Sequence, residues 1–479
     1  MNPSKPLRIA LLTYATKPRG SVIHTLELAE ALYGLGHKVC IYALDKDGLG
    51  FDRPLNCEVR LIPSKPAPAN IDGLIQQRIQ EFVDYLSRNQ LTHDLYHAQD
   101  CISANALALL KKGDRISHFL RTVHHIEDYS SIYLQQCQDR SIREADLCFC
   151  VSQVWQQELQ KQYQIQAPLV TNGVNTKHFS AIKNGSEIAL KRSLGLTGYP
   201  IYLTVGGIEP RKNSHKLLQA FAEVLTLYPH AQLAIAGGAT LFDYQLYREE
   251  FFDIAANLGI KEPQLIITGV VSHHELPVLY RCADAFVFPS VTEGWGLVIL
   301  EAIASGLPTI VSNMPPFTEF LSSENALLVD PLSIKAIAAA MQAICQKDLA
   351  DSIIKANQSI LENYSWGNLR KYIHHNTINF SKTMPEIRFQ IAWPDGSEEI
   401  CYSPSLIVQE YFTENADYDL ADFVERSRIS LTIASDRVLA KYGRPCGLAL
   451  GQLQTIELKA SQYQQLSAQS QVKVIRFLN

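Results

Sequence analysis

Residues 285–311, AFVFPSVTEGWGLVILEAIASGLPTIV, predict the architecture of most of the chain. AFVF has the length of a buried strand and ends in the loop PSVTEGWG. LVILEAIA predicts a helix that stops at Ser305-Gly306, and PTIV predicts the next strand. The stretch is therefore a strand–loop–helix–strand unit with a glycine-rich turn where the helix begins.

The predicted helix carries one acidic side chain. Every residue from Leu297 to Ala304 is apolar except Glu301, and a helix without a polar face is expected to be buried. A buried carboxylate is costly unless a donor hydrogen-bonds it. Glu301 is therefore either a structural residue paired with a local donor or a ligand-binding residue.

The loop before this helix favours a ligand. Glu293 lies eight residues before Glu301, and Gly294 and Gly296 let the backbone approach a ligand closely. Unpaired first-turn amides at the positive end of a helix dipole suit a phosphate. These amides belong to Trp295, Gly296 and Leu297. The arrangement suits a sugar nucleotide, with the sugar at Glu293, the diphosphate at the amides and the ribose at Glu301.

The pattern E-x7-E in EGWGLVILEAIASGLP resembles the signature of the large family of retaining nucleotide-sugar glycosyltransferases, glycosyltransferase family 4-like. The resemblance spans roughly residues 7–380. It implies an α/β chain of the GT-B fold, with two Rossmann-like doubly wound parallel-sheet domains facing a cleft. It also implies that Glu301 holds the donor ribose and that Glu293 contacts the donor sugar.

Composition narrows the function classes. A length of 479 residues predicts two or three domains, and a net charge of −5 argues against a general nucleic-acid binder. No apolar run reaches the roughly 18 residues of a membrane span, so at most peripheral membrane contact is expected. The start MNPSKPLRIALLTYA shows no signal-peptide pattern, and the ten cysteines form no CxxC pair. We expect a cytoplasmic protein with reduced thiols and no zinc site.

The amino-terminal half opens with another βαβ unit. LRIALLT predicts a buried strand, the loop YATKPRGS follows, and a helix is expected near residues 22–35 before the strand HKVCIYAL. Gly20 and Ser21 then lie at the start of the helix. The loop is similar to the family's P-x-G-G turn, which approaches the donor phosphates and the acceptor, with Ser21 in place of the second glycine.

In RTVHHIEDY the predicted strand ends at Val123, which puts His124 at the carboxyl edge of the sheet, where such folds bind ligands. A lone histidine is often structural. The resemblance matches His124 to a histidine that faces the transferred sugar. His125 is the alternative, because a slip of one residue would exchange the two.

The segment PLVTNGVNTKHFSAIKNG, residues 168–185, predicts the crossing between domains. It is similar to the family's P-N-G-V-D segment, with Thr171 and Asn175 as departures. We expect an acceptor-side domain at residues 1–175 with a return helix at 366–380, a donor domain at 176–365 and an accessory domain at 384–479.

The donor domain opens with IYLTVGGIEPRKNSHKLLQAF. Its strand is expected to end at Val205, with Arg211 and Lys212 in the loop over the carboxyl end. Two cations there suit a diphosphate leaving group, although a solvated basic loop is the alternative. The family has an arginine where Gly207 stands, so either Arg211 supplies that charge or phosphate binding is weaker.

Two further patterns concern the nucleotide and metals. TGVVSHHELPVLYRCAD resembles the family's nucleobase-holding turn, in which backbone groups of Val270 and Val271 read the base. Two D-x-D matches are interpreted as loop or helix-start acids, because neither lies beside the cation loop. We therefore expect no required metal and no cofactor. The D-x-D matches are Asp45/Asp47 and Asp417/Asp419.

About a hundred residues follow the transferase pattern. Ile387, Phe389 and Ile391 alternate with polar residues, and Pro394-Asp395-Gly396 predicts a hairpin turn before EEICY. Helices are expected near 405–412 and 420–442, and VKVIRFLN predicts a final strand. This small α+β domain resembles the small stand-alone nitrogen starvation response proteins in MPEIRF, WPDGSEE and CYSPS. That family implies no chemistry.

The resemblance thus implies transfer of a sugar from a nucleoside diphosphate to an unknown small-molecule, glycan or lipid acceptor, with retention of configuration. Arg211 and Lys212 would stabilise the diphosphate, while Glu293 and His124 would orient the sugar. Two alternatives remain. One is a nucleotide-sugar epimerase of the same fold, and the other is a catalytically weak sugar-nucleotide sensor linked to the nitrogen-starvation response.

Overall fold

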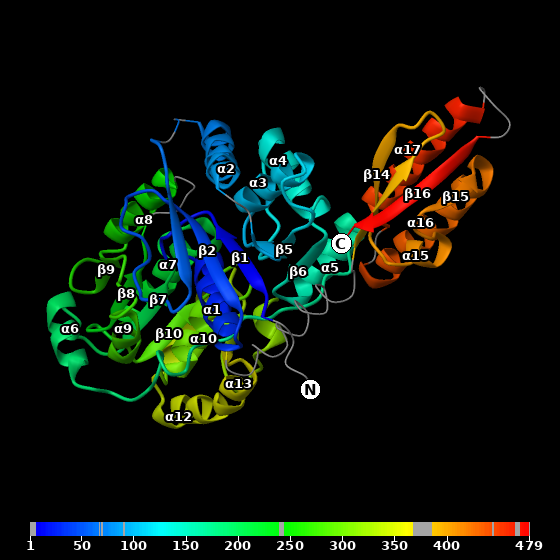
Figure 1. The fold of residues 1–479 in the computed structure, drawn as a ribbon. Helices are drawn as coiled ribbons and strands as arrows, with labels where there is room; N and C mark the ends of the chain where they lie inside the picture. Colours follow the sequence, from blue (N-terminus) through cyan, green and yellow to red (C-terminus); the bar gives the residue numbers. More distant parts are fainter. Residues whose placement is uncertain are drawn as a thin grey trace. The chain divides into compact units, whose positions relative to one another are not determined.

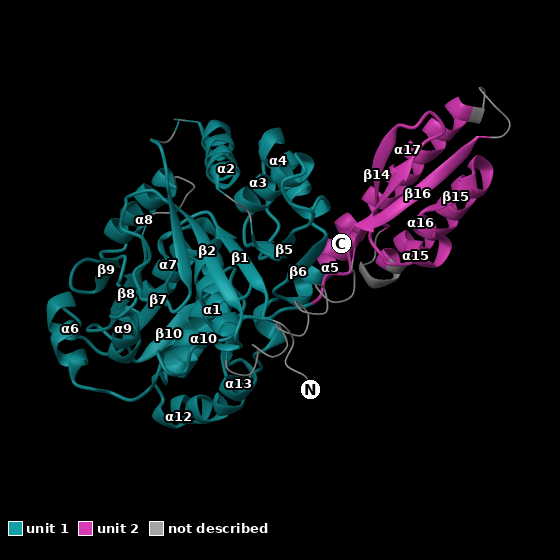
Figure 2. Cartoon of the chain, viewed as in Figure 1, with its two compact units in different colours: residues 1–156, 169–372 teal, residues 157–168, 373–479 magenta. Residues whose placement is uncertain are grey.

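The computed structural model describes residues 6–66, 68, 70–89, 92–238, 244–366, 386–442, 445–464 and 470–478. The chain forms two compact units (Figure 2). The first comprises residues 1–156 and 169–372, and the second comprises residues 157–168 and 373–479. The first unit contains two six-stranded sheets, and the second contains a four-stranded sheet (Figure 1).

The first sheet has the strand order β3-β2-β1-β4-β5-β6, and its neighbouring strands are parallel. The order reverses between β1 and β4, and in doubly wound sheets ligands bind at this switch point, outside the carboxyl ends of the strands. The elements are β1 (Arg8–Thr13), α1 (Gly20–Gly34), β2 (Lys38–Asp45), β3 (Glu58–Pro63), α2 (Ile71–Arg88), β4 (Leu95–Ala98), α3 (Cys101–Lys112), β5 (Leu120–Val123), α4 (Ile132–Arg143), β6 (Leu147–Cys150) and α5 (Gln153–Tyr163).

The second sheet repeats this topology as β12-β11-β10-β7-β8-β9, again with parallel neighbours. Its switch point lies between β7 and β10, so the loops that follow these two strands are neighbours. The elements are α6 (Ser186–Leu194), β7 (Ile201–Val205), η1 (Pro210–Lys212), α7 (Ser214–Leu225), β8 (Gln232–Ala236), α8 (Gln245–Asn257), β9 (Leu265–Gly269), α9 (Leu276–Cys282), β10 (Ala285–Phe288), α10 (Leu297–Ala304), β11 (Thr309–Ser312), η2 (Phe317–Glu319), β12 (Leu327–Val329), α11 (Ile334–Ala343), α12 (Lys347–Ala356) and α13 (Gln358–Asn363).

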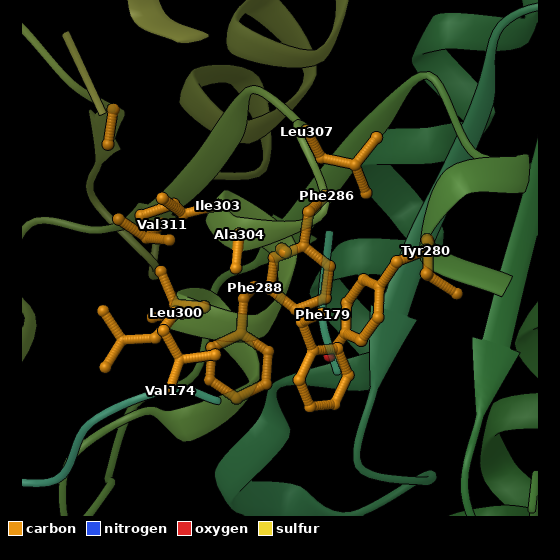
Figure 3. Close-up of a cluster of buried hydrophobic side chains, with 14 of the residues drawn as sticks. Val174, Phe179, Tyr280, Phe286, Phe288, Leu300, Ile303, Ala304, Leu307 and Val311 are labelled. Carbon is orange, nitrogen blue, oxygen red and sulfur yellow. The ribbon is translucent and has the colours of Figure 1, made fainter. Parts of the chain in front are cut away.

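Helix α10 is held by apolar packing. Leu300 and Ile303 are buried in one cluster with Phe286 and Phe288 of β10 and with Tyr280 of α9 (Figure 3). Burial stabilises each such side chain by about 1.5–3 kcal/mol. Several side chains of this size fix the start of α10 against the sheet, so the loop that precedes the helix is anchored at both ends.

The second unit contains the antiparallel sheet β14-β13-β16-β15. The predicted hairpin is present, because Trp393 N donates to Ser397 O (2.8 Å) across Pro394-Asp395-Gly396. The apolar core is drawn from residues 387–474. The elements are β13 (Ile387–Ala392), β14 (Glu398–Ser403), α15 (Val408–Tyr411), β15 (Ala416–Asp419), α16 (Leu420–Tyr442), α17 (Gly447–Gln464) and β16 (Gln471–Leu478).

Three expectations about local structure need correction. Asp417 and Asp419 lie on strand β15 rather than in a loop or at a helix start, because this short segment pairs with β16. Asp45 is the last residue of β2, and only Asp47 lies in the loop, where it forms an ion pair with Lys17. Helix α15 covers Val408–Tyr411 only, a single turn instead of the expected 405–412.

Other expectations are not tested by the described residues and stay predictions. The return helix at 366–380 falls outside the described residues except for Trp366, and the domain boundaries at 175, 365 and 384 remain predictions. None of the ten cysteines, all of them described, forms a disulfide. Within the described ranges, every helix is too short or too polar to cross a membrane.

Candidate functional site

A cavity of about 640 Å³ lies in the first unit, and loops at the carboxyl ends of both of its sheets line it. The cavity brings together every residue that the sequence singled out for catalysis or donor binding. These residues are Gly20, Ser21, His124, Arg211, Lys212, Val270, Val271, Glu293, Gly294, Trp295, Gly296, Leu297 and Glu301.

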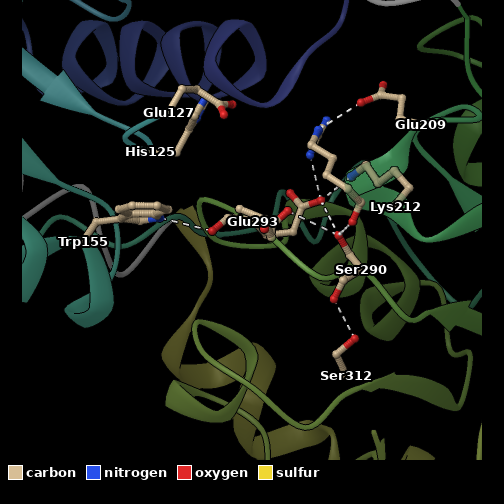
Figure 4. Close-up of polar contacts among 10 residues, drawn as sticks. His125, Glu127, Trp155, Glu209, Lys212, Ser290, Glu293 and Ser312 are labelled. Carbon is tan, nitrogen blue, oxygen red and sulfur yellow. Dashed lines mark hydrogen bonds and ion pairs between the residues drawn. The ribbon is translucent and has the colours of Figure 1, made fainter. Parts of the chain in front are cut away.

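Glu293 is the centre of a charged cluster in this cavity (Figure 4). Its Oε1 accepts hydrogen bonds from Lys212 Nζ (2.5 Å), Arg211 Nη1 (2.8 Å) and Ser290 Oγ (3.0 Å). Arg211 Nε also donates to Glu209 Oε2 (2.9 Å). The side chain of Glu293 is 11% exposed and that of Lys212 10%, so the two charges interact away from bulk water.

Two loops hold this cluster in place. The loop after β7 carries Arg211 and Lys212, and the loop after β10 carries Glu293. Val291 N donates to Arg211 O (2.8 Å), and Asn213 Nδ2 donates to the carbonyl oxygens of Pro289 (3.1 Å) and Pro331 (2.6 Å). The adjacency of β7 and β10 therefore explains why residues about eighty positions apart in the chain meet.

The cluster determines the charge of its members. Burial raises the pKa of Glu293, but Lys212 and Arg211 outweigh it, so the pKa lies below its usual range. Burial lowers the pKa of Lys212, and the Glu293 carboxylate opposes that shift. Lys212 Nζ also lies 4.4 Å from the ring centroid of Phe288. Glu293 is therefore a carboxylate, and the arginine and lysine beside it keep donors to spare for a second anion.

The backbone conformation and the close packing at position 207 require a glycine. Its φ is +79°, and a Cβ at this position would lie 2.8 Å from Gly238 O. The arginine that the resembled family has here would be strained and would meet backbone. The positive charge in this loop therefore comes from Arg211 and Lys212.

Two helix N-termini also line the cavity. Neither α1, which begins at Gly20, nor α10, which begins at Leu297, has a side-chain cap hydrogen bond. First-turn amides without such caps are available to an anion. Gly294 packs closely, since a Cβ there would lie 2.4 Å from His124 O. The backbone of the Glu293 loop therefore touches the His124 strand end.

The geometry around Glu301 is compatible with both interpretations made from the sequence, and its role in donor binding stays a prediction. Glu301 is buried, and Tyr280 Oη donates to its Oε2 (2.9 Å), which is the local donor that a structural role requires. It also lines the cavity, and no described residue donates to its Oε1. Burial raises the pKa of Glu301 to about 7, while Tyr280 lowers it and Glu27 adds to the rise.

His124 follows β5 and is 8% exposed. Its ring lies edge-on to His24, with centroids 4.8 Å apart, and within the described residues its Nε2 has no hydrogen-bond partner. Burial lowers the pKa of His124 well below its usual range, with His24 and Arg121 adding to the shift. His124 is therefore a neutral imidazole. His125 also lines the cavity but pairs with Glu127 (3.0 Å).

The sequence missed several residues of the site. Ser290 and Glu209 complete the charged cluster, and Tyr280 completes the Glu301 pair. Ser290 and Glu209 lie in the loops already singled out, so their polar side chains were a usable signal. Tyr280 lies on another helix, and its contact follows only from packing.

Over the described ranges, no group of three or more His, Cys, Asp or Glu side chains is arranged to hold a metal ion. The expectation that no metal is required remains a prediction.

Three family models match the chain. Residues 18–178 match "Glycosyltransferase Family 4", residues 187–360 match "Glycosyl transferases group 1", and residues 388–477 match "Nitrogen starvation-induced protein NitG". An uncharacterized glycosyltransferase of Methanocaldococcus jannaschii is 26% identical over 404 residues, covering 80% of this chain and 99% of the relative.

Solved structures share the fold of the transferase part. Sucrose-phosphate synthase from Thermosynechococcus elongatus aligns with a TM-score of 0.66 and 22% identity, over 78% of this chain and 99% of that one. HepE from Anabaena, solved in complex with UDP and glucose, aligns with a TM-score of 0.63 and 18% identity, over 78% of this chain and 100% of that one. Both likenesses concern the fold, with two Rossmann-like sheets.

Proposed function

The chain belongs to the family 4 and group 1 glycosyltransferases of the GT-B fold and carries a NitG domain, and we propose that it transfers a sugar from a nucleoside diphosphate with retention of configuration. One observation carries the proposal. The Glu293–Arg211–Lys212 cluster and two helix N-termini without side-chain caps line a single cavity at the switch points of two doubly wound sheets.

The donor would use the groups that remain available. The diphosphate fits the spare donors of Arg211 and Lys212 and the first-turn amides of α10, because preorganised donors stabilise charge on a leaving group. Glu301 Oε1 offers an acceptor to the ribose hydroxyls. The neutral His124 ring and the Glu293 carboxylate would bind sugar hydroxyls.

The state of Glu293 argues against a covalent intermediate on this residue and so supports a single-step route to retention. Its Oε1 accepts three hydrogen bonds, and the backbone around it is anchored to Arg211, so this carboxylate is a poor nucleophile. We propose instead that the acceptor hydroxyl attacks the sugar C1 from the face that the diphosphate leaves. The C1–oxygen bond to the diphosphate breaks, the bond to the acceptor forms, and the hydroxyl proton passes to the departing phosphate oxygen.

The test begins with the donor. Thermal shift with a panel of nucleoside diphosphate sugars would identify the base and sugar, and UDP-glucose is the first choice because HepE was solved with UDP and glucose. NMR of the product anomer then reports the stereochemistry. An inverted product would refute the mechanism. Sugar interconversion without any acceptor would indicate the epimerase, and tight binding with hydrolysis alone would indicate the sensor.

A further inference from the structure

The part of the cavity that the first sheet lines contains a buried arginine that forms no ion pair with any described residue. Arg121 lies on β5, is 6% exposed and lines the cavity. Lys17, Arg53, Arg211 and Lys212 also line it, and each of these cations pairs with a carboxylate.

The donors of Arg121 are only partly used. Nη1 donates to Thr122 O, whereas Nε has no hydrogen-bond partner and no described residue accepts from Nη2. Nε and Nη2 form the edge of the guanidinium that binds a carboxylate or phosphate through two parallel hydrogen bonds. A buried charge without such a partner costs several kcal/mol, so an unused edge at a cavity wall indicates a ligand.

Asp100, the acid with the strongest electrostatic effect on Arg121, already accepts hydrogen bonds from two backbone amides. Asp100 caps α3 through Ser103 N (2.8 Å to Oδ1), and its Oδ2 accepts from Tyr14 N (2.8 Å). Burial raises the pKa of Asp100, with Arg121 opposing the rise, so the carboxyl group is a weak counter-charge. Asp100 therefore stabilises the strand–helix turn, and Arg121 has no ion pair among the described residues.

A neutral polar side chain, that of Gln99, lines the same cavity as Arg121. Gln99 follows β4, the strand that pairs with β5, and Ala98 is in register with Arg121. Gln99 is fully buried and lines the cavity, yet within the described structure its side-chain nitrogen and oxygen both lack partners. An amide with both groups free can bind a hydroxyl as donor and as acceptor.

We propose that the acceptor is a hydroxyl compound with an oxyanion group, which binds as a pair of hydrogen bonds to the Nε/Nη2 edge of Arg121 while Gln99 holds a hydroxyl. This inference rests on the proposed function, because it assigns the acceptor of that same cavity. Arg121 lies three positions before His124, the residue that would contact the donor sugar. The anion thus selects the acceptor and sets its hydroxyl toward the donor.

The test uses the full chain and glucose 6-phosphate as the probe. UDP binding is measured first by calorimetry, and the probe is then titrated into protein saturated with UDP so that the donor phosphate site is filled. Glucose 6-phosphate should bind at least tenfold more tightly than glucose. Arg121→Gln should weaken the phosphate ester by about 10–100-fold, the scale of hydrogen bonds to a charged group.

Further variants and probes test the hydroxyl contact of Gln99 and the kind of anion that Arg121 binds. Gln99→Leu should weaken glucose 6-phosphate and glucose alike, because it removes a hydroxyl contact. Arg8→Gln is the matched control, since Arg8 pairs with Asp94 at the opposite end of β1, and it should change nothing. Glucuronate tests a carboxylate, and dioctanoyl phosphatidic acid tests a lipid phosphate. The probe whose binding Arg121→Gln weakens shows whether the anion is a sugar phosphate, a carboxylate or a lipid phosphate.

Two failures have different meanings. If the wild-type chain does not bind UDP, that result counts against the proposed function. Titration of glucose 6-phosphate into the protein without UDP would then still test the role of Arg121. Equal binding of glucose and glucose 6-phosphate, no binding of any anionic probe, or an unchanged affinity in Arg121→Gln would overturn the subsite. If Arg121→Gln does not fold, Arg121→Lys is used, because lysine keeps the positive charge but cannot form two parallel hydrogen bonds. An unchanged affinity of Arg121→Lys for glucose 6-phosphate would overturn the contact through Nε and Nη2.

Discussion

At the scale of single residues, the site depends on how two cations share two carboxylates. Arg211 bonds both Glu209 and Glu293, while Lys212 bonds only Glu293 among carboxylates of the described residues. Lys212 therefore has more donors left for a phosphate, and its burial gives each of them a larger effect than an exposed lysine would have.

Replacing Lys212 with alanine should lower turnover by about 10²–10³-fold, the scale for losing one charge-stabilising donor. Steady-state kinetics with the donor found by thermal shift would measure it. Lys216→Ala is the matched control, because Lys216 lies on the next helix and, among the described residues, donates only to the Leu332 carbonyl oxygen, at 3.2 Å. Full turnover in the Lys212 variant would remove this residue from the mechanism.

Replacing Arg211 with alanine should lower turnover in the same range, because Arg211 supplies the charge that Gly207 cannot. It should also release Glu209 and Glu293 from an ion pair, so part of the loss could come from the cluster geometry. Arg211→Lys separates the two effects, since it keeps the charge. If Arg211→Ala turns over normally, the idea that it compensates for Gly207 is wrong.

Glu301 gives the site a dependence on pH. Its pKa of about 7 means that the carboxyl group is largely protonated at pH 6 and largely ionised at pH 8. Ribose hydroxyls bond better to the ionised form, so the affinity for UDP should rise by about tenfold between these values. Calorimetry at both pH values tests this. Glu301→Gln should remove that rise and leave only the pH dependence of UDP itself.

Glu301 should also make folding stability depend on pH, but this stability should fall, rather than rise, as the pH increases. The pKa of about 7 in the folded protein lies above the ordinary glutamate value of 4.5. The stability from the protonated form is therefore fully present below about 4.5 and is lost as the pH rises through 7. Glu301→Gln should consequently show a smaller fall in melting temperature from pH 6 to pH 8 than the wild-type chain. An equal fall in both proteins would contradict the raised pKa.

At the scale of elements, much of the site could be predicted because it lies in short segments next to strand ends. The E-x7-E stretch, the two glycines before α10 and His124 after β5 were all visible as local patterns. Tyr280, Arg121 and Gln99 were not, because only packing brings Tyr280 to Glu301 and leaves buried polar atoms of Arg121 and Gln99 without partners among the described residues. Strand β15 was missed because four polar-alternating residues become a strand only by pairing with β16.

Any side chain at Gly207, in the turn after β7, should destabilise the fold. Gly207→Ala adds a Cβ to a left-handed backbone and places it 2.8 Å from Gly238 O, so it should destabilise the fold by more than the roughly 1–2 kcal/mol of the conformation alone. Gly259→Ala is the matched control, with φ +71° and open space around the Cβ. Urea unfolding of both variants measures the difference. Equal losses would show that the clash is relieved.

The loops after β7 and β10 also bear on metal dependence. Two cations and the uncapped start of α10 face the place where the diphosphate would bind, so its charge can be neutralised by the protein alone. Activity should therefore survive excess EDTA. Loss of turnover that magnesium or manganese restores would contradict this expectation.

At the scale of the whole molecule, the transferase part and the NitG domain have separate cores. The core of the NitG domain draws only on residues 387–474, and those around β7–β12 draw on residues 151–360. Residues 157–168 nevertheless group with the second unit. Separate cores predict separate folding of the two parts.

A chain that ends at Lys382 should therefore fold and keep its donor turnover, and residues 383–479 should melt cooperatively alone. Both predicted sheets, the cation loops and the predicted return helix precede the cut, and about a hundred residues suffice for an independent domain. Heat denaturation and donor turnover of each piece, beside the full chain, measure the outcome. Fusion would then serve to hold a partner or acceptor near the cavity at high effective concentration. Aggregation of the shorter transferase, or a tail without a cooperative transition, would show instead that residues 157–168 and the tail complete one structure and that the domain division is wrong.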